Sequence, residues 1–144
     1  GVDEAGRGPL AGPVVAAAVV LPERGVPRGI DDSKKLCANA RAALSARLYK
    51  VALVGVGVAS VEEIDRLNIY HATLLAMARA VDALGIAPGM VLVDGNARPR
   101  WDHASVTVVG GDSLCLSIAA ASIVAKHHRD SLMIEADSAH PGYN

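Results

Sequence analysis

The chain has 144 residues, 51% of them apolar, and a formal net charge of −1, so its length suits one domain with a substantial core. This charge does not by itself indicate a nucleic-acid partner and does not exclude one, because clustered catalytic carboxylates would cancel a basic surface in the sum. No apolar run reaches the roughly 18 to 20 residues needed to cross a membrane, and the N-terminus lacks a signal-peptide pattern. We therefore expect a soluble cytoplasmic protein.

The predicted elements alternate between strands and helices, which indicates an α/β domain. Strands are expected where Val and Ala cluster, and helices where apolar residues recur every three or four positions. The expected strands are residues 1–4, 14–21, 51–59, 90–93 and 106–109. The expected helices are residues 34–50, a short helix beginning at residue 60, residues 69–84 and residues 113–137.

Local signals support several of these boundaries. Asp32 offers N-cap chemistry for the helix expected from Lys34, and Ser60 with Glu63 has the form of a capping box. The two cysteines, Cys37 and Cys115, lie far apart and match no metal-ligand spacing, so we expect reduced, partly buried thiols.

Carboxylates follow the ends of three expected strands. Asp3 and Glu4 come at the end of the first strand, Asp94 closes the fourth and Asp112 follows the fifth. Strand ends are where an α/β sheet gathers functional groups from distant parts of a chain. Because adjacent residues of a regular strand point to opposite faces, we expect Asp3 and Glu4 to share a site only if the chain bends at Glu4.

Four carboxylates in one small volume would require neutralising cations. Two unit charges about 4 Å apart repel by roughly 4 kcal/mol at an effective dielectric of 20. Oxygen ligands without His or Cys suit Mg²⁺ or Mn²⁺, and a pair of such ions serves in-line phosphoryl transfer. A single Asp after a strand is more often a turn residue or a helix cap. The spacing alone therefore leaves both interpretations open.

Specific motifs resemble those of the ribonuclease HII family, the type 2 ribonucleases H. The matching segments occur in the family's order and together run along nearly the whole chain. They are GVDEAGRGP (1–9), DSKKL (32–36), NIYHAT (68–73), VDGN (93–96), GDS (111–113), IAAASIVAK (118–126) and RD (129–130).

The resemblance implies a single RNase H-like catalytic domain over residues 1–144, with a mixed central sheet of about five strands flanked by helices. It implies hydrolysis of the RNA strand of RNA–DNA hybrids and at single ribonucleotides embedded in duplex DNA, with roles in DNA replication and ribonucleotide excision repair. In the family, a metal-activated water attacks the phosphate in line and leaves 3′-hydroxyl and 5′-phosphate ends. Two Mg²⁺ or Mn²⁺ ions would be held at the four matching positions, Asp3, Glu4, Asp94 and Asp112. The implied partners are these nucleic acids, with no membrane, and a monomer is expected.

The resemblance also assigns substrate contacts. The turn formed by Gly6, Arg7 and Gly8 matches the segment that recognises the ribose 2′-hydroxyl, the group that separates RNA from DNA. Glycines let backbone groups approach the sugar closely. Five further positions are expected to face the substrate: Ser33, Lys34, Asn68, Thr73 and Lys126. Ser33 and Lys34 begin a predicted helix, where phosphate can bind, and Lys35 stays undecided.

The chain departs from the family at its end. The family carries a further C-terminal segment whose Tyr packs beside the sugar at the RNA-to-DNA junction. This chain stops at residues 140–144, and Tyr143 is not the matching residue. We therefore expect a fragment that keeps its metal ligands, with junction specificity and activity open.

Purely structural roles are also open for several of these residues. Ser33 and Lys34 could belong to a solvated helix start, Asn68 and Thr73 could be simple caps, and Lys126 could belong, with Arg129, to a surface helix face. The remaining charged residues are expected not to bind metal: Glu62, Glu63 and Asp65 at a solvated helix start, Asp130 on a helix surface or in an ion pair, and His127 and His128.

Three functional hypotheses follow. The first is the type 2 ribonuclease. The second is the related type 3 branch, which would carry Lys where Arg7 stands, so Arg7 favours type 2. The third is a module that holds hybrids without cutting them. The glycine spacing from Gly6 and the pair Gly55 and Gly57 do not indicate a dinucleotide site, because neither leads from a strand into a helix.

Overall fold

The computed structural model describes residues 1–8 and 11–139. The elements in chain order are β1 (Val2–Ala5), β2 (Val14–Val20), the 3₁₀ turn η1 (Ser33–Lys35), α1 (Ala38–Val51), β3 (Leu53–Ala59), α2 (Val61–Asp82), β4 (Val91–Asp94), β5 (Ser105–Val108), α3 (Gly111–Leu114) and α4 (Leu116–Ala139). Within these ranges no helix is both long enough and apolar enough to span a membrane.

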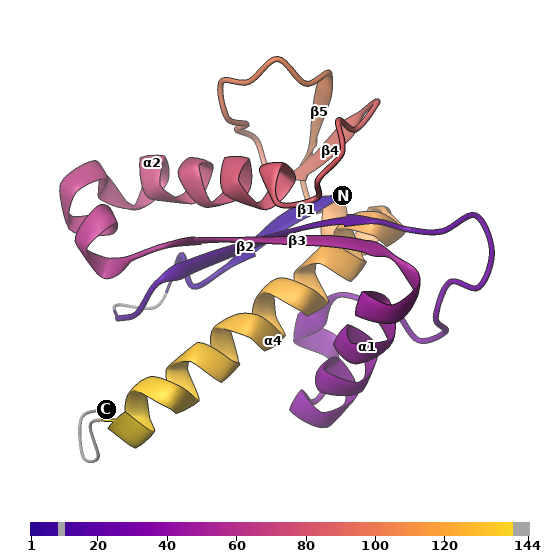
Figure 1. Cartoon of the computed structure of the whole chain (residues 1–144), viewed down its shortest axis with the longest axis horizontal. Helices are drawn as coiled ribbons and strands as arrows, with labels where there is room; N and C mark the ends of the chain where they lie inside the picture. Colours follow the sequence, from indigo (N-terminus) through magenta and orange to yellow (C-terminus); the bar gives the residue numbers. More distant parts are fainter. Residues whose placement is uncertain (9–10, 140–144) are drawn as a thin grey trace.

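The five strands form one mixed sheet in the order β3-β2-β1-β4-β5. The strands β3, β2 and β1 pair antiparallel, whereas β1 with β4 and β4 with β5 pair parallel. The helix α2 covers one face, and α1 with α4 covers the other (Figure 1). The expected α/β class and five-stranded mixed sheet are confirmed.

Small residues let α2 lie close to the sheet. A Cβ atom on Gly55 or Gly57 of β3 would collide with the backbone of α2 at Ala80 or Ala76. The alternation of Val and Gly in β3 therefore serves helix packing, in agreement with the rejection of a dinucleotide motif. The residues of α2 that face β3 are themselves small and buried, so the helix backbone can pack directly against the strand.

The helix expected from residue 34 to residue 50 is wrong at its start. Ser33–Lys35 is a separate 3₁₀ turn, and α1 begins only at Ala38. The reason is tertiary: the guanidinium of Arg41 in α1 donates to the backbone carbonyls of Ser33 and Leu36, which holds the turn apart from the helix. The predicted strand 51–59 correspondingly begins at Leu53, since α1 runs through Val51.

The other helices show one confirmed boundary and one correction. The predicted division between a short helix and a helix from residue 69 is confirmed as a kink in α2 at Asn68, whose φ of 70° and ψ of 167° are non-helical. The helix expected over residues 113–137 is confirmed as α4 (Leu116–Ala139), but its expected start is wrong. A one-turn helix, α3, already contains Asp112, and extended backbone at Cys115 separates it from α4.

Candidate metal centre

Three acidic side chains converge at the sheet edge where β1 and β4 end. One carboxylate oxygen of each of Asp3, Glu4 and Asp94 lies within 4.8 Å of the others. The first two come from β1, and the third is the last residue of β4, about ninety positions later in the chain. The convergence that the sequence pattern indicated is therefore present for these three residues.

The expected bend at Glu4 is not how Asp3 and Glu4 come together. The pairing of β1 with β2 continues in regular register through Ala5. The pairing of β1 with β4, by contrast, is limited to Val2 with Val93, so the edge of β1 beyond Val2 is open. Asp3 also turns back on its own strand, since its Oδ1 accepts the backbone N–H of Glu4 at 2.7 Å.

The site is electrostatically crowded. Burial, with the neighbouring Glu4 and Asp94 carboxylates, raises the pKa of Asp3 from 3.8 to about 9. Burial and Asp94 also raise the pKa of Glu4, although Arg7 opposes this shift. Asp3 is only 5% exposed. Without a cation these groups therefore share protons instead of carrying full charge.

The donor set fits a hard divalent cation. Glu4 Oε2 is buried and has no hydrogen-bond partner among the described residues, which is unusual for a buried carboxylate oxygen. No basic side chain of the described chain forms an ion pair with Asp3, Glu4 or Asp94. Closely spaced carboxylates with free oxygen lone pairs suit Mg²⁺ or Mn²⁺, and the absence of Cys and His ligands disfavours Zn²⁺.

Asp112 lies beside this group and does not join it. Its backbone N–H donates to Asp94 Oδ1 at 3.3 Å, while its carboxylate stands outside the 4.8 Å cluster. Burial first, and then the nearby carboxylates of Asp32 and Asp94, raise the pKa of Asp112, and the Lys34 ammonium opposes the shift. The expectation of four carboxylates in one volume is therefore met for three residues, with the fourth adjacent and turned toward Asp32.

Gly111 is a residue that the sequence reasoning did not single out. A Cβ atom there would lie 2.6 Å from Ile118 Cδ1 and 3.2 Å from Asp94 Oδ1. Only glycine lets the start of α3 approach β4 closely enough for the hydrogen bond from Asp112 to Asp94. The signal that could have identified it is the Gly110–Gly111 pair directly before Asp112.

The turn after β1 brings Gly6 and Arg7 to the site. Gly6 has a φ of +94°, and a Cβ atom there would collide with the side chain of Arg129. Arg129 is buried, and it donates to the carbonyls of Pro13 at 3.1 Å and Ala11 at 2.7 Å. The interpretation of Arg129 as part of a surface helix face is therefore wrong, because this buried guanidinium supports the turn from inside.

The remainder of this turn is only partly described. Gly8 is exposed and has open space around its Cα, so its backbone is accessible. Pro9, which belongs to the family-like motif, lies outside the described residues, as does Tyr143.

The expected phosphate site at Ser33 and Lys34 is changed by the structure. The backbone N–H of Ser33 donates to Ser122 Oγ at 3.3 Å, and that of Lys34 donates to Asp32 Oδ1 at 3.0 Å. Ser33 is also buried. The backbone donors of this turn are thus already occupied, and the exposed Lys34 ammonium is the group left to meet an anion.

The remaining predicted contacts divide into exposed and buried positions. Asn68 is exposed, and its Oδ1 accepts the N–H of His71 at 3.0 Å, so it caps the second half of α2. Thr73 is buried, and its hydroxyl donates to the Ile69 carbonyl at 2.7 Å, which favours a packing role. Lys126 forms an ion pair with Asp130 at 3.0 Å.

The groups expected to lie outside the site do so. Glu63 completes the capping box with Ser60 and pairs with Arg79 at 2.7 Å, and Asp130 is an ion-pair residue. His127 and His128 belong to no metal-binding group of the described chain. Both thiols are free as expected, although Cys37 is exposed and not partly buried.

Comparison with known proteins agrees with these motifs. The family profile described as Ribonuclease HII matches residues 1–144. The chain is 67% identical to the ribonuclease HII of Rhizorhabdus wittichii and 60% identical to that of Sphingopyxis alaskensis, covering 99% of this chain and 71% and 72% of those proteins. It is also similar to the crystal structure of the ribonuclease H2 from Pyrococcus horikoshii, with a TM-score of 0.85 and 26% identity over 100% of this chain and 77% of that one.

These matches decide between the two branches left open above. The profile and both relatives are of type 2, as the arginine at position 7 indicated. The chain belongs to the ribonuclease HII family and is a ribonuclease H hydrolase.

Proposed function

We propose that this chain cuts the RNA strand of RNA–DNA hybrids, and duplex DNA at single ribonucleotides, with two divalent cations held at the site described above. The observation that carries this proposal is the convergence of Asp3, Glu4 and Asp94 within 4.8 Å, with a buried Glu4 oxygen that lacks a partner. Family membership supplies the class of reaction, and the carboxylate cluster supplies a place for it.

The three converging carboxylates would hold the cations, and Asp112 would complete the set by turning from Asp32 toward Asp94. Mg²⁺ or Mn²⁺ ions at such a site lower the pKa of an attacking water and neutralise the charge that develops on the phosphate. The hydrogen bond from the Asp112 backbone to Asp94 fixes the distance between β4 and α3 in either position of the Asp112 side chain.

Selection for RNA would depend on the turn after β1. Gly6 permits the turn that follows Glu4, and Gly8 leaves backbone groups exposed there, so a ribose could approach them closely. Because the 2′-hydroxyl is the group that distinguishes ribose from deoxyribose, one ribonucleotide in duplex DNA would suffice for recognition. The side chain of Arg7 lies near enough to Glu4 to influence its pKa and would meet the adjacent phosphate. Attack of water on the scissile phosphate, with breakage of the bond from phosphorus to the 3′ oxygen, would give 3′-hydroxyl and 5′-phosphate ends.

The test is cleavage of duplex DNA that contains one ribonucleotide, and of an all-RNA–DNA hybrid, with Mg²⁺, with Mn²⁺ and with EDTA. We expect cutting with either cation, none with EDTA, and ends that carry 3′-hydroxyl and 5′-phosphate groups. Asp94→Asn should abolish cutting and leave hybrid binding largely intact.

The matched control is Asp65→Asn, an exposed aspartate of α2 outside the site, which should cut at the wild-type rate. Wild-type cutting by Asp94→Asn, or cutting that persists in EDTA, would contradict the metal assignment. A wild-type chain that binds both substrates and cuts neither would identify it as a binding module.

A further inference from the structure

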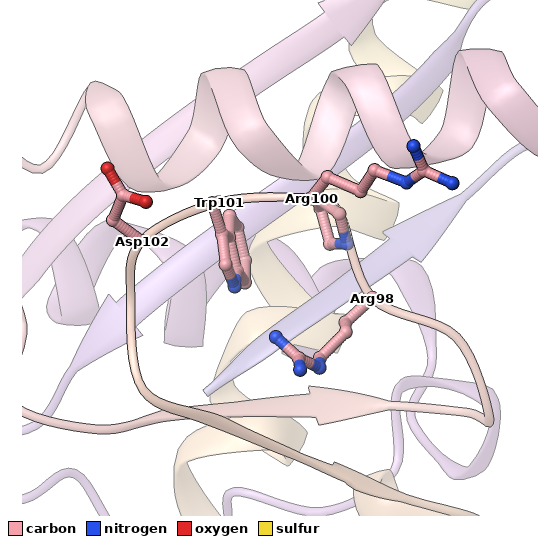
Figure 2. Close-up of a pocket in the computed structure, with 5 residues that line it drawn as sticks. Arg98, Arg100, Trp101 and Asp102 are labelled. Carbon is pink, nitrogen blue, oxygen red and sulfur yellow. The ribbon is translucent and has the colours of Figure 1, made fainter.

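The segment of residues 95–104, which joins β4 to β5, passes over α2 and forms a groove with it. The groove has a volume of about 680 Å³ and lies between Tyr70 and His71 on α2 and Arg98 and Arg100 on the segment. A second hollow of about 550 Å³ adjoins it along the segment and shares both arginines (Figure 2). We call this surface the arginine groove.

The residues of the segment alternate between the protein interior and solvent. Pro99 is buried and Trp101 is half-buried against the core below α2, whereas Arg98 and Arg100 are exposed. Ser105 Oγ accepts a hydrogen bond from Arg98 Nη1 at 3.1 Å and another from Trp101 Nε1 at 3.0 Å. The packed residues therefore hold the backbone in place and present two guanidinium groups to solvent.

The arginine groove carries two arginines and one aspartate, Asp102, so its charge is positive on balance. Neither Arg98 nor Arg100 forms an ion pair within the part of the chain that the structure describes. No described residue that lines the 680 Å³ groove carries a carboxylate. Asp102 lines only the second hollow, and Figure 2 shows it on the opposite side of Trp101 from Arg100.

The two guanidinium groups point in different directions. Figure 2 shows Arg100 directed toward α2 and Arg98 directed to the other side of the segment. They cannot grip one small anion together. Such an arrangement suits a polyanion with regularly spaced charges, such as the phosphodiester backbone, whose charges recur about every 3.4 Å of helix axis on each strand.

The segment that forms the groove begins directly after Asp94 of the candidate metal centre. Arg98 is four residues beyond Asp94, so their Cα atoms are at most about 14 Å apart, or about four base-pair steps along a duplex. On the other wall, the N–H of His71 is bonded to Asn68, which was predicted to face the substrate. A duplex seated at the carboxylates can therefore extend along this surface.

We propose that the arginine groove binds the phosphate backbone of the substrate duplex a few base pairs from the point of cleavage. This inference rests on the proposed function, since it takes the substrate to be a hybrid or ribonucleotide-containing duplex. The contacts position the duplex and are independent of base sequence, as is usual for arginine on phosphate.

The test compares Arg98→Ala/Arg100→Ala with Arg98→Lys/Arg100→Lys and with a matched control, Arg24→Ala/Arg28→Ala. Arg24 and Arg28 are also exposed and lie in the loop after β2, where Arg28 follows the buried Pro27. Affinity for a fluorescent RNA–DNA hybrid of about 20 base pairs, long enough to pass the groove at 3.4 Å per step, is measured over a series of salt concentrations in the Asp94→Asn background. Cleavage is measured in the otherwise wild-type background.

Loss of two phosphate contacts should reduce the slope of log affinity against log salt by about 1.8, since each contact contributes about 0.9. We expect the double alanine variant to bind about 5- to 20-fold more weakly near 0.1 M salt, with KM raised and kcat unchanged. The double lysine variant should keep most of the slope, and the control should match the parent.

Two results would overturn the proposal. One rejects only the groove as a contact, and the other also rejects the proposed function. If the parent protein binds and cuts the hybrid while the double alanine variant matches it in slope and KM, the groove is not a duplex contact. If the parent protein does not bind the hybrid at all, the proposed function falls together with the groove. Circular dichroism of each variant checks that the exposed substitutions leave the fold unchanged.

Discussion

Two clusters of charged residues in this protein are built in opposite ways. On α4, Asp130 lies 3.0 Å from Lys126 and 3.5 Å from Arg41, so each charge has an opposite neighbour. At the ends of β1 and β4, three carboxylates face one another, and none forms an ion pair within the described chain. Paired charges contribute modestly to stability, whereas gathered like charges oppose folding.

The carboxylate cluster is therefore the place where this fold loses stability in favour of function. A raised pKa at Asp3 and a partnerless oxygen at Glu4 are costs that the folded protein bears without a bound cation. Such costs cluster at functional sites, because a ligand that binds only the folded state can offset them. Substitutions in the two clusters should therefore change activity and stability to different degrees.

The largest effect is expected from Glu4→Gln. It removes one anionic ligand while keeping the side-chain volume, so we expect cleavage of a hybrid to fall by about 1,000-fold or more, corresponding to about 4 kcal/mol of lost transition-state stabilisation. Single-turnover cleavage with saturating Mg²⁺ or Mn²⁺ measures it. Glu62→Gln, on the exposed start of α2, is the matched control and should cut normally. Equal rates for the two variants would remove Glu4 from the site.

Gly111→Ala should affect stability and activity together. The added methyl group would meet Ile118 Cδ1 at 2.6 Å and Asp94 Oδ1 at 3.2 Å, and overpacking of this kind costs about 1 to 3 kcal/mol. Urea unfolding gives the loss of free energy, and cleavage should fall because Asp94 is displaced. Gly89→Ala, where nothing lies within 4 Å, should leave both unchanged. A neutral Gly111→Ala would show that the approach of α3 to β4 is not critical.

The pH dependence of stability should reveal the crowded carboxylates. The pKa of Asp3 is raised from 3.8 to about 9 in the folded protein, so the folded state holds this proton more tightly than the unfolded state does. The contribution to stability is full below the unfolded pKa and is lost as pH rises between these two values. In EDTA, the Tm should therefore fall across this window on account of Asp3.

Asp3→Asn and divalent cations provide the comparison. The amide cannot ionise, so the variant should be more stable than wild type in EDTA near neutral pH, by about 1 kcal/mol or more. Mg²⁺ or Mn²⁺ should raise the Tm of wild type, increasingly toward higher pH, because the cation competes with protons for the carboxylates. Thermal melts of both proteins would refute this account if cations changed neither Tm.

The smallest effect is expected from the paired cluster. Lys126→Ala removes an exposed i,i+4 ion pair, which contributes about 0.2 to 1 kcal/mol. The same variant tests the predicted substrate contact, which would raise KM for the hybrid. Lys50→Ala, on the exposed side of α1, is the control. An unchanged KM for Lys126→Ala would leave Lys126 with its ion-pair role alone.

Much of the architecture was predictable because its signals are local. The five strands, the kink at Asn68 and the capping box of Ser60 with Glu63 follow from composition, turn residues and spacing over a few positions. The separation of η1 from α1 was not predictable in this way. It depends on Arg41 bonding to carbonyls of the preceding turn, and no helical periodicity encodes that contact.

The candidate site shows the same division. The sequence by itself determined which carboxylates stand at strand ends and, through its motifs, the family to which the chain belongs. Only the tertiary structure decided that Asp3 and Glu4 meet Asp94 without a break in the pairing of β1, and that the Asp112 carboxylate stays outside this cluster. The physical reason is that strand periodicity fixes the face on which a side chain begins. Where its oxygens end depends on neighbours that come from remote parts of the chain.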